Sequence, residues 1–354
     1  MVMAQSLFLT LKQTAPDCLI DVLAPAWSFP LLDRMPEVTN AIAMPLTHGE
    51  FGLSARFKLG RQLRLEKYDQ AIVLPNSWKS ALIPFFAGIP RRTGFFGECR
   101  WGLLNDARKL DKTLLTMTVQ RFVALALPKD ARLPPAYPMP ALIVEQARQQ
   151  AVIQKFGLTR SVTAPAPGRS AAFTPSLAIA APATGRLTAY TPALALCPGA
   201  EYGTAKRWPA GYYADVARQK LNQGWQVWLF GSDKDQAVAG QINQMAGGLC
   251  TDFTGRTTLA EAVDLLSLTD TVVTNDSGLM HVAAALNKTI IALYGSSSPG
   301  FTPPLSAKAH ILSLNLICSP CFKRECPLYP PEHEAHTHCL TGIRPERVLE
   351  LIAP

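Results

Sequence analysis

The segment Thr274-Asn275-Asp276-Ser277-Gly278-Leu279-Met280-His281-Val282-Ala283-Ala284-Ala285 decides the fold. β-Favouring residues 271–273 precede it and an apolar helical pattern follows it, which predicts a turn between a buried strand and a helix. In open α/β sheets, ligands bind at such strand ends. The unpaired N–H groups and positive dipole end of the new helix favour an anion, above all a phosphate. We expect Asp276 or Ser277 to cap the helix, while Gly278 lets a ligand approach the backbone.

Two further turns follow predicted strands and resemble the first. Residues 197–209 read CPGAEYGTAKRWP after the strand-like run Ala193–Cys197, and residues 294–299 read YGSSSP after the apolar run Thr289–Tyr294. The first of these two turns carries glycines, a hydroxyl, two cations and a proline where a helix would start. Each turn alone is also compatible with an ordinary strand–helix connection. Together they indicate one ligand-binding rim of one parallel sheet.

Length and composition indicate a globular protein of two domains. The chain has 354 residues, of which 48% are hydrophobic and 17% are charged. No apolar run approaches the roughly 20 residues that a membrane-spanning helix needs. A basic leader followed by an apolar core is not apparent at the N-terminus, so we expect a cytoplasmic protein.

The charge balance indicates an acidic partner. The formal net charge is +8, which suits a phosphorylated substrate, an anionic lipid surface or nucleic acid, although it is also compatible with a plain surface excess. Arginine and lysine recur between residues 91 and 112, interleaved with aromatic side chains. No stretch resembles a nucleic-acid-binding module, so we expect no nucleic-acid partner.

Eight cysteines are present, and four of them cluster near the C-terminus: Cys318, Cys321, Cys326 and Cys339. The first two have the spacing of metal ligands, but a clean second pair is missing. A structural metal therefore stays open, while a reduced, loop-forming segment fits a cytoplasmic protein better. We expect no cofactor.

Alternating strand and helix patterns predict an α/β fold with two doubly wound, Rossmann-like domains facing a cleft. The predicted limits are residues 1–160 for an N-terminal domain, 161–190 for a Pro/Ala-rich linker, 191–342 for a C-terminal domain and 343–354 for a final helix. In the first domain we expect one long helix over Lys112–Leu127. That domain opens on a helix rather than on a central strand, so either its sheet is built in another order or the strand and turn expected before Val2 are missing.

Several motifs carry a family resemblance that covers nearly the whole chain. They include LAPAW at 23–27, LPNSWKSA at 74–81, CPGAE at 197–201, KRWP at 206–209, SSPGFTPP at 297–304 and CSPCFKRECP at 318–327. Together with the segment at 274–285, these motifs resemble the ADP-heptose:lipopolysaccharide heptosyltransferases of glycosyltransferase family 9. The resemblance implies the GT-B fold, with the nucleotide sugar in the C-terminal domain and the acceptor in the N-terminal domain.

The resemblance also implies the reaction and its partners. The implied reaction is the inverting, metal-independent transfer of heptose from ADP-L-glycero-D-manno-heptose to the first heptose of the phosphorylated lipopolysaccharide inner core. The implied location is in peripheral contact with the inner membrane of a Gram-negative cell. The general base implied is an aspartate in a Gly-Asp turn that would precede Met1. Asp17 and Asp21 lie beyond the first helix and do not replace it, so no catalytic residue is assigned, and we expect the chain as written to be nearly inactive.

The predicted site residues fall into two groups. The donor-binding residues are Thr204, Lys206, Asp235, Asp276, Ser277, Gly278 and Leu279, and the acceptor-binding residues are Asn76, Lys79, Arg91 and Arg92. Arg100 is expected to join the acceptor group. A metal-free diphosphate leaving group needs fixed positive charge, which Lys206 can supply. Lys206 as a surface lysine, Asp235 as a helix cap and His281 as a packed residue are the plainer interpretations.

Two other function classes stay open from the sequence. One is a sugar-nucleotide-binding protein that is inactive in transfer because the base is absent. The other is a nicotinamide-dependent oxidoreductase, but no Gly-x-Gly-x-x-Gly follows any predicted strand, which argues against it.

Overall fold

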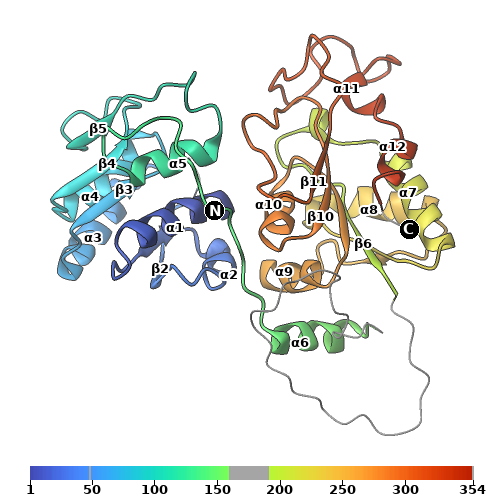
Figure 1. The fold of residues 1–354 in the computed structure, drawn as a ribbon, viewed down its shortest axis with the longest axis horizontal. Helices are drawn as coiled ribbons and strands as arrows, with labels where there is room; N and C mark the ends of the chain where they lie inside the picture. Colours follow the sequence, from blue (N-terminus) through green and yellow to red (C-terminus); the bar gives the residue numbers. More distant parts are fainter. Residues whose placement is uncertain (48, 159–190, 353–354) are drawn as a thin grey trace, which may run out of the picture.

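The computed structural model describes residues 1–47, 49–158 and 191–352, which form two α/β halves lying side by side (Figure 1). The predicted linker at 161–190 lies outside the described residues. The N-terminal half runs to helix α5, and the C-terminal half begins at strand β6. Within the described ranges, no helix is both long enough and apolar enough to cross a membrane.

The C-terminal half is built on one parallel sheet of six strands. Its order is β11-β10-β9-β6-β7-β8, which is the doubly wound arrangement, with the reversal of strand order between β9 and β6. The strands are β6 (Ala193–Cys197), β7 (Gln226–Leu229), β8 (Thr251–Asp252), β9 (Thr271–Asn275), β10 (Thr289–Leu293) and β11 (Ala309–Leu312).

Helices cover both faces of this sheet because its central strands are apolar on both sides. Along β6, Ala193, Ala195 and Cys197 pack in one core cluster, while Leu194 and Leu196 pack in the other. Helices α9 and α10 contribute to the first cluster, and α7, α8 and α12 to the second. The helices of this half are α7 (Ala210–Asn222), α8 (Gln236–Met245), α9 (Leu259–Ser267), α10 (Gly278–Ala285), α11 (His338–Thr341) and α12 (Pro345–Leu349), with the 3-10 turns η5 (Thr204–Lys206) and η6 (Asp233–Asp235).

The described strands of the N-terminal half form two separate parallel sheets. One contains β1 (Asp21–Ala24) and β2 (Asn40–Ala43), and the other contains β3 (Gln70–Val73), β4 (Arg91–Phe95) and β5 (Asp106–Arg108). The helices around them are α1 (Gln5–Thr14), α2 (Phe29–Leu32), α3 (Leu53–Leu63), α4 (Leu82–Phe86) and α5 (Thr118–Ala126), with the 3-10 turns η1 (Val2–Ala4), η2 (Ala26–Ser28), η3 (Arg64–Glu66) and η4 (Trp78–Ala81).

The predicted helix over Lys112–Leu127 is wrong in its first part. The helix begins only at Thr118. The Asp111 carboxylate accepts the backbone N–H groups of Thr113 and Leu114, so a local turn replaces the first helical turn. The final helix is also shorter than predicted, since it ends at Leu349.

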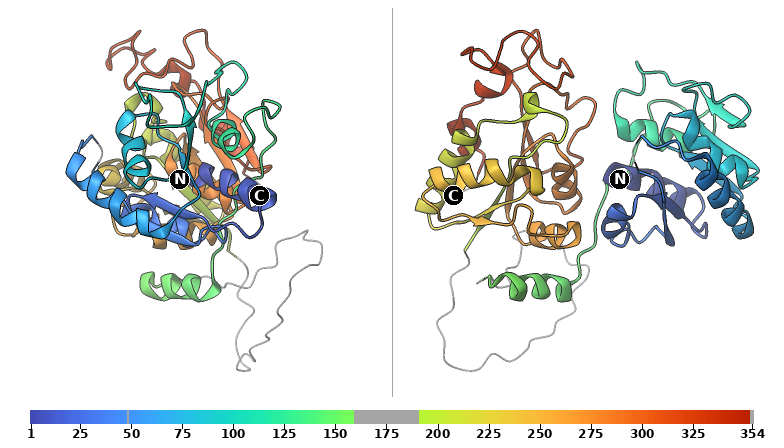
Figure 2. Two further views of the ribbon diagram at one scale, coloured as in Figure 1. Left: turned by 90° about the vertical axis from the view of Figure 1, so that its left-hand side faces the viewer. Right: turned by 180° about the vertical axis from the view of Figure 1, so that it is seen from behind.

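The two halves share buried contacts. Helix α6 (Gln146–Phe156) follows the N-terminal half in sequence but packs against α9 below the C-terminal half (Figure 2). Arg34, just after α2, makes an ion pair of 2.6 Å with Asp264 of α9, and both side chains are buried. The amino terminus lies on the side of its half that faces the C-terminal half, where η1 contacts α10.

Candidate functional site

Three segments that are distant in sequence meet at the carboxyl end of the six-stranded sheet. Asn275, at the end of β9, is fully buried. Its side-chain amide donates to the Pro198 carbonyl at 2.8 Å, and its side-chain oxygen accepts the Trp208 N–H at 3.1 Å. Asn275 therefore fixes both ends of the turn at residues 198–208 against β9, a structural role that the sequence analysis did not assign.

Lys206 and Asp276 form the central ion pair of this rim. The Lys206 ammonium lies 2.6 Å from the Asp276 carboxylate, and both side chains are largely buried. The Thr302 hydroxyl donates to the second carboxylate oxygen at 3.3 Å, and the ammonium also lies 5.2 Å from the centre of the Tyr202 ring. Lys206 is thus held inside the rim, which argues against a freely solvated surface lysine.

The amino end of α10 opens beside this pair. Ser277 is the N-cap residue, but its side chain accepts no capping hydrogen bond, and its hydroxyl instead lies 3.2 Å from that of Thr274. A Cβ added to Gly278 would meet no atom within 4 Å. A ligand can therefore approach the backbone at Gly278, and the first N–H groups of a helix, here up to Leu279, have no partners within the helix, which suits an anion.

The structure places the other two predicted donor residues differently. Thr204 begins η5, two residues before Lys206, so it belongs to the same turn. Asp235 instead completes the capping box of η6, because its Oδ2 accepts the N–H and the hydroxyl of Ser232 at 2.9 and 2.8 Å; its side chain makes no cap hydrogen bond to α8. The same carboxylate fills the space where Gly199 would carry a Cβ. These contacts favour the capping role for Asp235 over sugar binding.

His281 lies one turn into α10, next to the ion pair. Burial lowers the pKa of His281 to about 4; the charge of Asp276 opposes this effect, and the Met1 ammonium and Lys206 add to it. Its Nδ1 is buried and has no hydrogen-bond partner among the residues that the structure describes. The imidazole is therefore neutral at neutral pH, and its environment includes the first residue of the chain.

The predicted acceptor residues separate into two places. Asn76 and Lys79 follow β3, so they lie at the carboxyl ends of the strands. The Lys79 ammonium donates to the Glu50 carbonyl at 3.3 Å, and the Asn76 side-chain oxygen accepts from Arg100 at 3.4 Å. Exposed aromatic side chains border these residues, with Phe51 and Trp78 in ring contact at 5.1 Å.

Arg91 and Arg92 lie at the opposite end of that sheet. They begin β4 and pair with Gln70 and Ala71 at the start of β3. At about 3.3 Å per residue, the strand separates Arg91 from the rim by roughly 13–16 Å. Arg92 donates to the backbone carbonyls of residues 89 and 103. The structure thus does not bring these two arginines together with Asn76 and Lys79.

The expectation for Arg100 is corrected. Its side chain is 1% exposed and donates to the carbonyls of Pro75 and Phe95. Burial lowers the pKa of this guanidinium, although the charge of Glu98 opposes the effect. Arg100 therefore holds the loops after β3 and β4 together and is not available to a substrate.

The clustered cysteines line a hollow of about 180 Å³ next to the turn at residues 198–208 (the donor turn), together with Ala205 and Ser296. Burial first, and then the nearby thiols of Cys318, Cys321 and Cys326, raise the pKa of Cys339 to about 11. Across the described ranges, no three His, Cys, Asp or Glu side chains are placed to hold a metal ion.

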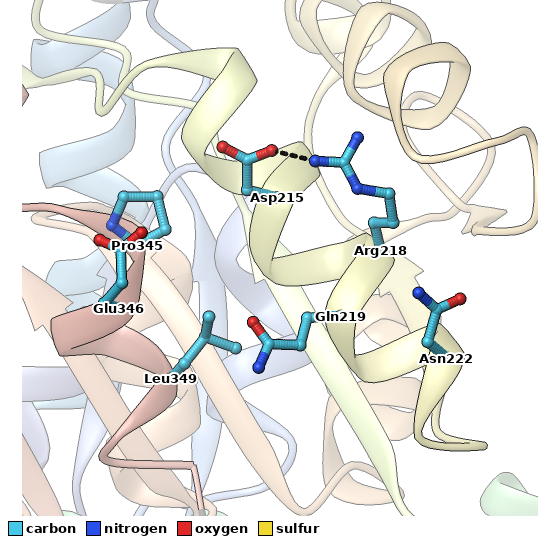
Figure 3. A pocket seen from close by; sticks show the side chains of 7 residues that line it. All are labelled: Asp215, Arg218, Gln219, Asn222, Pro345, Glu346 and Leu349. Atoms are coloured by element: carbon cyan, nitrogen blue, oxygen red, sulfur yellow. Dashed lines mark hydrogen bonds and ion pairs between the residues drawn. The ribbon is translucent and has the colours of Figure 1, made fainter.

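A larger hollow, of about 390 Å³, lies away from the rim. It is an open, polar depression between α7 and α12, where Asp215 and Arg218 pair on the helix surface (Figure 3). None of the predicted site residues lines it, so the size of a hollow does not identify the site here.

Comparison with known proteins agrees with this geometry. The sequence profile described as Glycosyltransferase family 9 (heptosyltransferase) matches residues 56–331. The chain belongs to glycosyltransferase family 9. It is therefore a glycosyltransferase, which excludes the oxidoreductase alternative.

Several family 9 proteins are similar along most of this chain. Lipopolysaccharide heptosyltransferase 2 of Escherichia coli K12 is 44% identical over 99% of the chain and 93% of that protein. Lipooligosaccharide heptosyltransferase 2 of Haemophilus influenzae is 48% identical over 89% of the chain and 85% of that protein.

Solved structures confirm the fold class. The structure of E. coli ADP-heptose LPS heptosyltransferase II has a TM-score of 0.77 and 42% identity, covering 99% of this chain and 93% of that one. A family 9 glycosyltransferase from Veillonella parvula has a TM-score of 0.74 at 18% identity, covering 99% and 91%, and supports the fold alone. The α/β fold with two Rossmann-like domains of the GT-B type is thus confirmed.

Proposed function

We propose that the protein transfers heptose from ADP-L-glycero-D-manno-heptose to the first heptose of the lipopolysaccharide inner core, with inversion and without a metal. The observation that carries the donor half of this proposal is the Lys206–Asp276 pair beside the open amino end of α10. The names of the relatives, which are 44–48% identical, support the acceptor half.

Transfer requires stabilisation of the leaving diphosphate. Negative charge develops on the phosphate as the bond to the sugar breaks, and fixed donors and cations at that point lower the barrier. Lys206 supplies a cation held in place by Asp276 and Tyr202. The N–H groups at Ser277, Gly278 and Leu279 supply the helix-terminus contribution. Thr204 adds a hydroxyl from the same turn as Lys206.

We assign no general base to this chain. Asp21 is excluded by its position at the start of β1, where it accepts the Tyr68 hydroxyl at 2.6 Å and the Asn40 amide at 2.9 Å. The place that the resemblance implies for the base, just before Met1, borders the donor site, because η1 at the start of the chain contacts α10.

The alternative of a binding protein without transfer activity gains no support from the relatives, which are named as transferases. A direct assay separates the two functions. The protein is incubated with ADP-heptose and an inner-core acceptor that carries one heptose, with and without EDTA, and mass spectrometry follows the acceptor. Because the relatives are named as transferases, we replace the expectation of near inactivity: one heptose should be added and ADP released in both conditions. Binding of ADP-heptose without any transfer would favour the alternative.

Lys79 is proposed to contact the phosphorylated acceptor at the carboxyl end of the sheet that contains β3, β4 and β5. Lys79→Glu should raise the KM for acceptor roughly three- to tenfold, as for reversal of one partly exposed charge, with ADP affinity unchanged. Arg91→Glu is the matched control, because Arg91 carries the same charge at the other end of the sheet. Equal effects of both variants in steady-state kinetics would argue against an acceptor site at this rim.

We further propose that the protein works on the cytoplasmic side of the inner membrane, with helix α3 as the contact surface. Its outer face exposes Leu53 and Phe57 next to Lys58 and Arg61, and Leu65 of η3 is 80% exposed. Apolar and basic side chains on one helix face suit an anionic bilayer surface.

Vesicle binding tests this surface. The double variant Phe57→Ser, Leu65→Ser should sediment several-fold less with vesicles that contain anionic lipid, because burial of two large apolar side chains is lost. Leu249→Ser, in the C-terminal half at a side chain that is 71% exposed, should bind like the parent protein. Unchanged sedimentation of the double variant would exclude α3 as the contact surface.

A further inference from the structure

The cysteine-rich segment, residues 318–327, packs directly against the donor turn. The Ala205 N–H donates to the Arg324 carbonyl at 3.0 Å, and the Tyr202 hydroxyl donates to the Phe322 carbonyl at 2.9 Å. The contact is close, because a Cβ on Gly203 would lie 2.3 Å from the Arg324 carbonyl oxygen. The backbone at residues 322–324 is therefore held in a fixed position next to Thr204 and Lys206.

This packing places a second cation against the same aromatic ring as Lys206. The Arg324 guanidinium lies 5.4 Å from the centre of the Tyr202 ring, and the Lys206 ammonium lies 5.2 Å from the same centre. Aromatic faces attract cations, so the Tyr202 ring contributes to holding both groups at the donor turn. Arg324 itself is exposed, which leaves its N–H groups accessible to a ligand.

The charge balance at the rim favours a further positive group. Lys206 is paired with Asp276, so these two residues together contribute no net charge toward a diphosphate. Arg324 takes part in no ion pair within the described ranges of the chain. Its planar guanidinium matches two phosphate oxygens at once, a geometry that a lysine lacks.

We propose that Arg324 is a second phosphate-binding cation of the donor site, contacting the diphosphate of ADP-heptose together with Lys206. This inference rests on the proposed function. It also gives the cysteine-rich segment a role at the donor site: its packing against residues 202–205 presents Arg324 to the ligand.

Titration of ADP into the protein, at low and at moderate salt, tests the proposal. Arg324→Gln keeps most of the side-chain stem and removes the charge. We expect ADP affinity to fall about ten- to a hundredfold, as for the loss of a hydrogen bond to a charged group, and the salt dependence of binding to become weaker. Arg324→Lys should retain part of the affinity. Lys323→Gln, an equal charge change at the neighbouring exposed residue, should bind ADP like the parent protein.

Four outcomes would overturn the proposal. Equal ADP affinities of Arg324→Gln and Lys323→Gln would show that Arg324 does not contact the ligand. A weaker affinity with unchanged salt dependence would show that Arg324 only supports the turn. Weakening by Lys206→Ala but not by Arg324→Gln would remove Arg324 and leave the proposed function intact, whereas a parent protein that bound no ADP would contradict both.

Discussion

Lys206→Ala is expected to weaken ADP binding by about 1.5–3 kcal/mol, which is roughly 10- to 150-fold. The substitution removes the cation next to the start of α10, and it leaves the Asp276 carboxylate, whose side chain is 7% exposed, without its ion-pair partner and with the Thr302 hydroxyl as a remaining donor. Part of the loss therefore comes from repulsion between Asp276 and the phosphates. Isothermal titration calorimetry with ADP measures the effect.

Two further variants make this measurement specific. In the double variant Lys206→Ala, Asp276→Asn, the repulsion is absent, so part of the ADP affinity should return. Lys234→Ala is the matched control, since Lys234 lies after β7 on the same rim but pairs with Glu201 at 71% side-chain exposure. An ADP affinity of Lys206→Ala equal to that of Lys234→Ala would remove Lys206 from the donor site.

Asp264→Ala is expected to lower the free energy of unfolding by about 3–5 kcal/mol, the range measured when one partner of a buried ion pair is removed. The side chains of Arg34 and Asp264 are 2% and 6% exposed, and their contact of 2.6 Å joins the N-terminal half to α9. The variant leaves the Arg34 guanidinium buried, with the carbonyls of Pro30 and Ala260 as its remaining acceptors.

The same helix supplies the control for this prediction. Glu261 of α9 pairs with Lys155 of α6 at 2.5 Å, but the lysine side chain is 53% exposed. Lys155→Ala, which leaves the hydrogen bond from the Thr258 N–H to Glu261 intact, should cost at most about 1 kcal/mol, because solvent screens such a pair. Denaturant unfolding of the two variants compares them directly, and a similar small loss in both would mean that the Arg34–Asp264 pair contributes little to holding the two halves together.

Most of the C-terminal half could be predicted from the sequence because its signals are local. Apolar strands such as Ala193–Cys197 alternate with amphipathic helices, and each strand end carries glycine or small polar residues. The N-terminal half was predicted less completely. β5 has three residues and no distinctive pattern, and Asp111 replaces a helical turn by side-chain hydrogen bonds that periodicity does not reveal.

The site shows the same division between local and long-range information. The turn at 275–279 and Lys206 could be identified locally, and the structure brings Lys206 to Asp276 across 70 residues. The position of Arg91 and Arg92 could have been recognised, because residues that begin a predicted parallel strand lie away from the ligand rim. The structural role of Asn275 and the proposed role of Arg324 could not be recognised from the sequence, since both depend on contacts between distant segments.

A structure of the protein with ADP bound tests the central claim most directly. We predict that the diphosphate lies at the amino end of α10, within hydrogen-bonding distance of the Lys206 ammonium and of the N–H groups at Ser277 and Gly278. The Lys206–Asp276 distance should then exceed its present 2.6 Å. A diphosphate bound elsewhere, for example in the depression between α7 and α12, with the Lys206–Asp276 pair unchanged, would contradict the account.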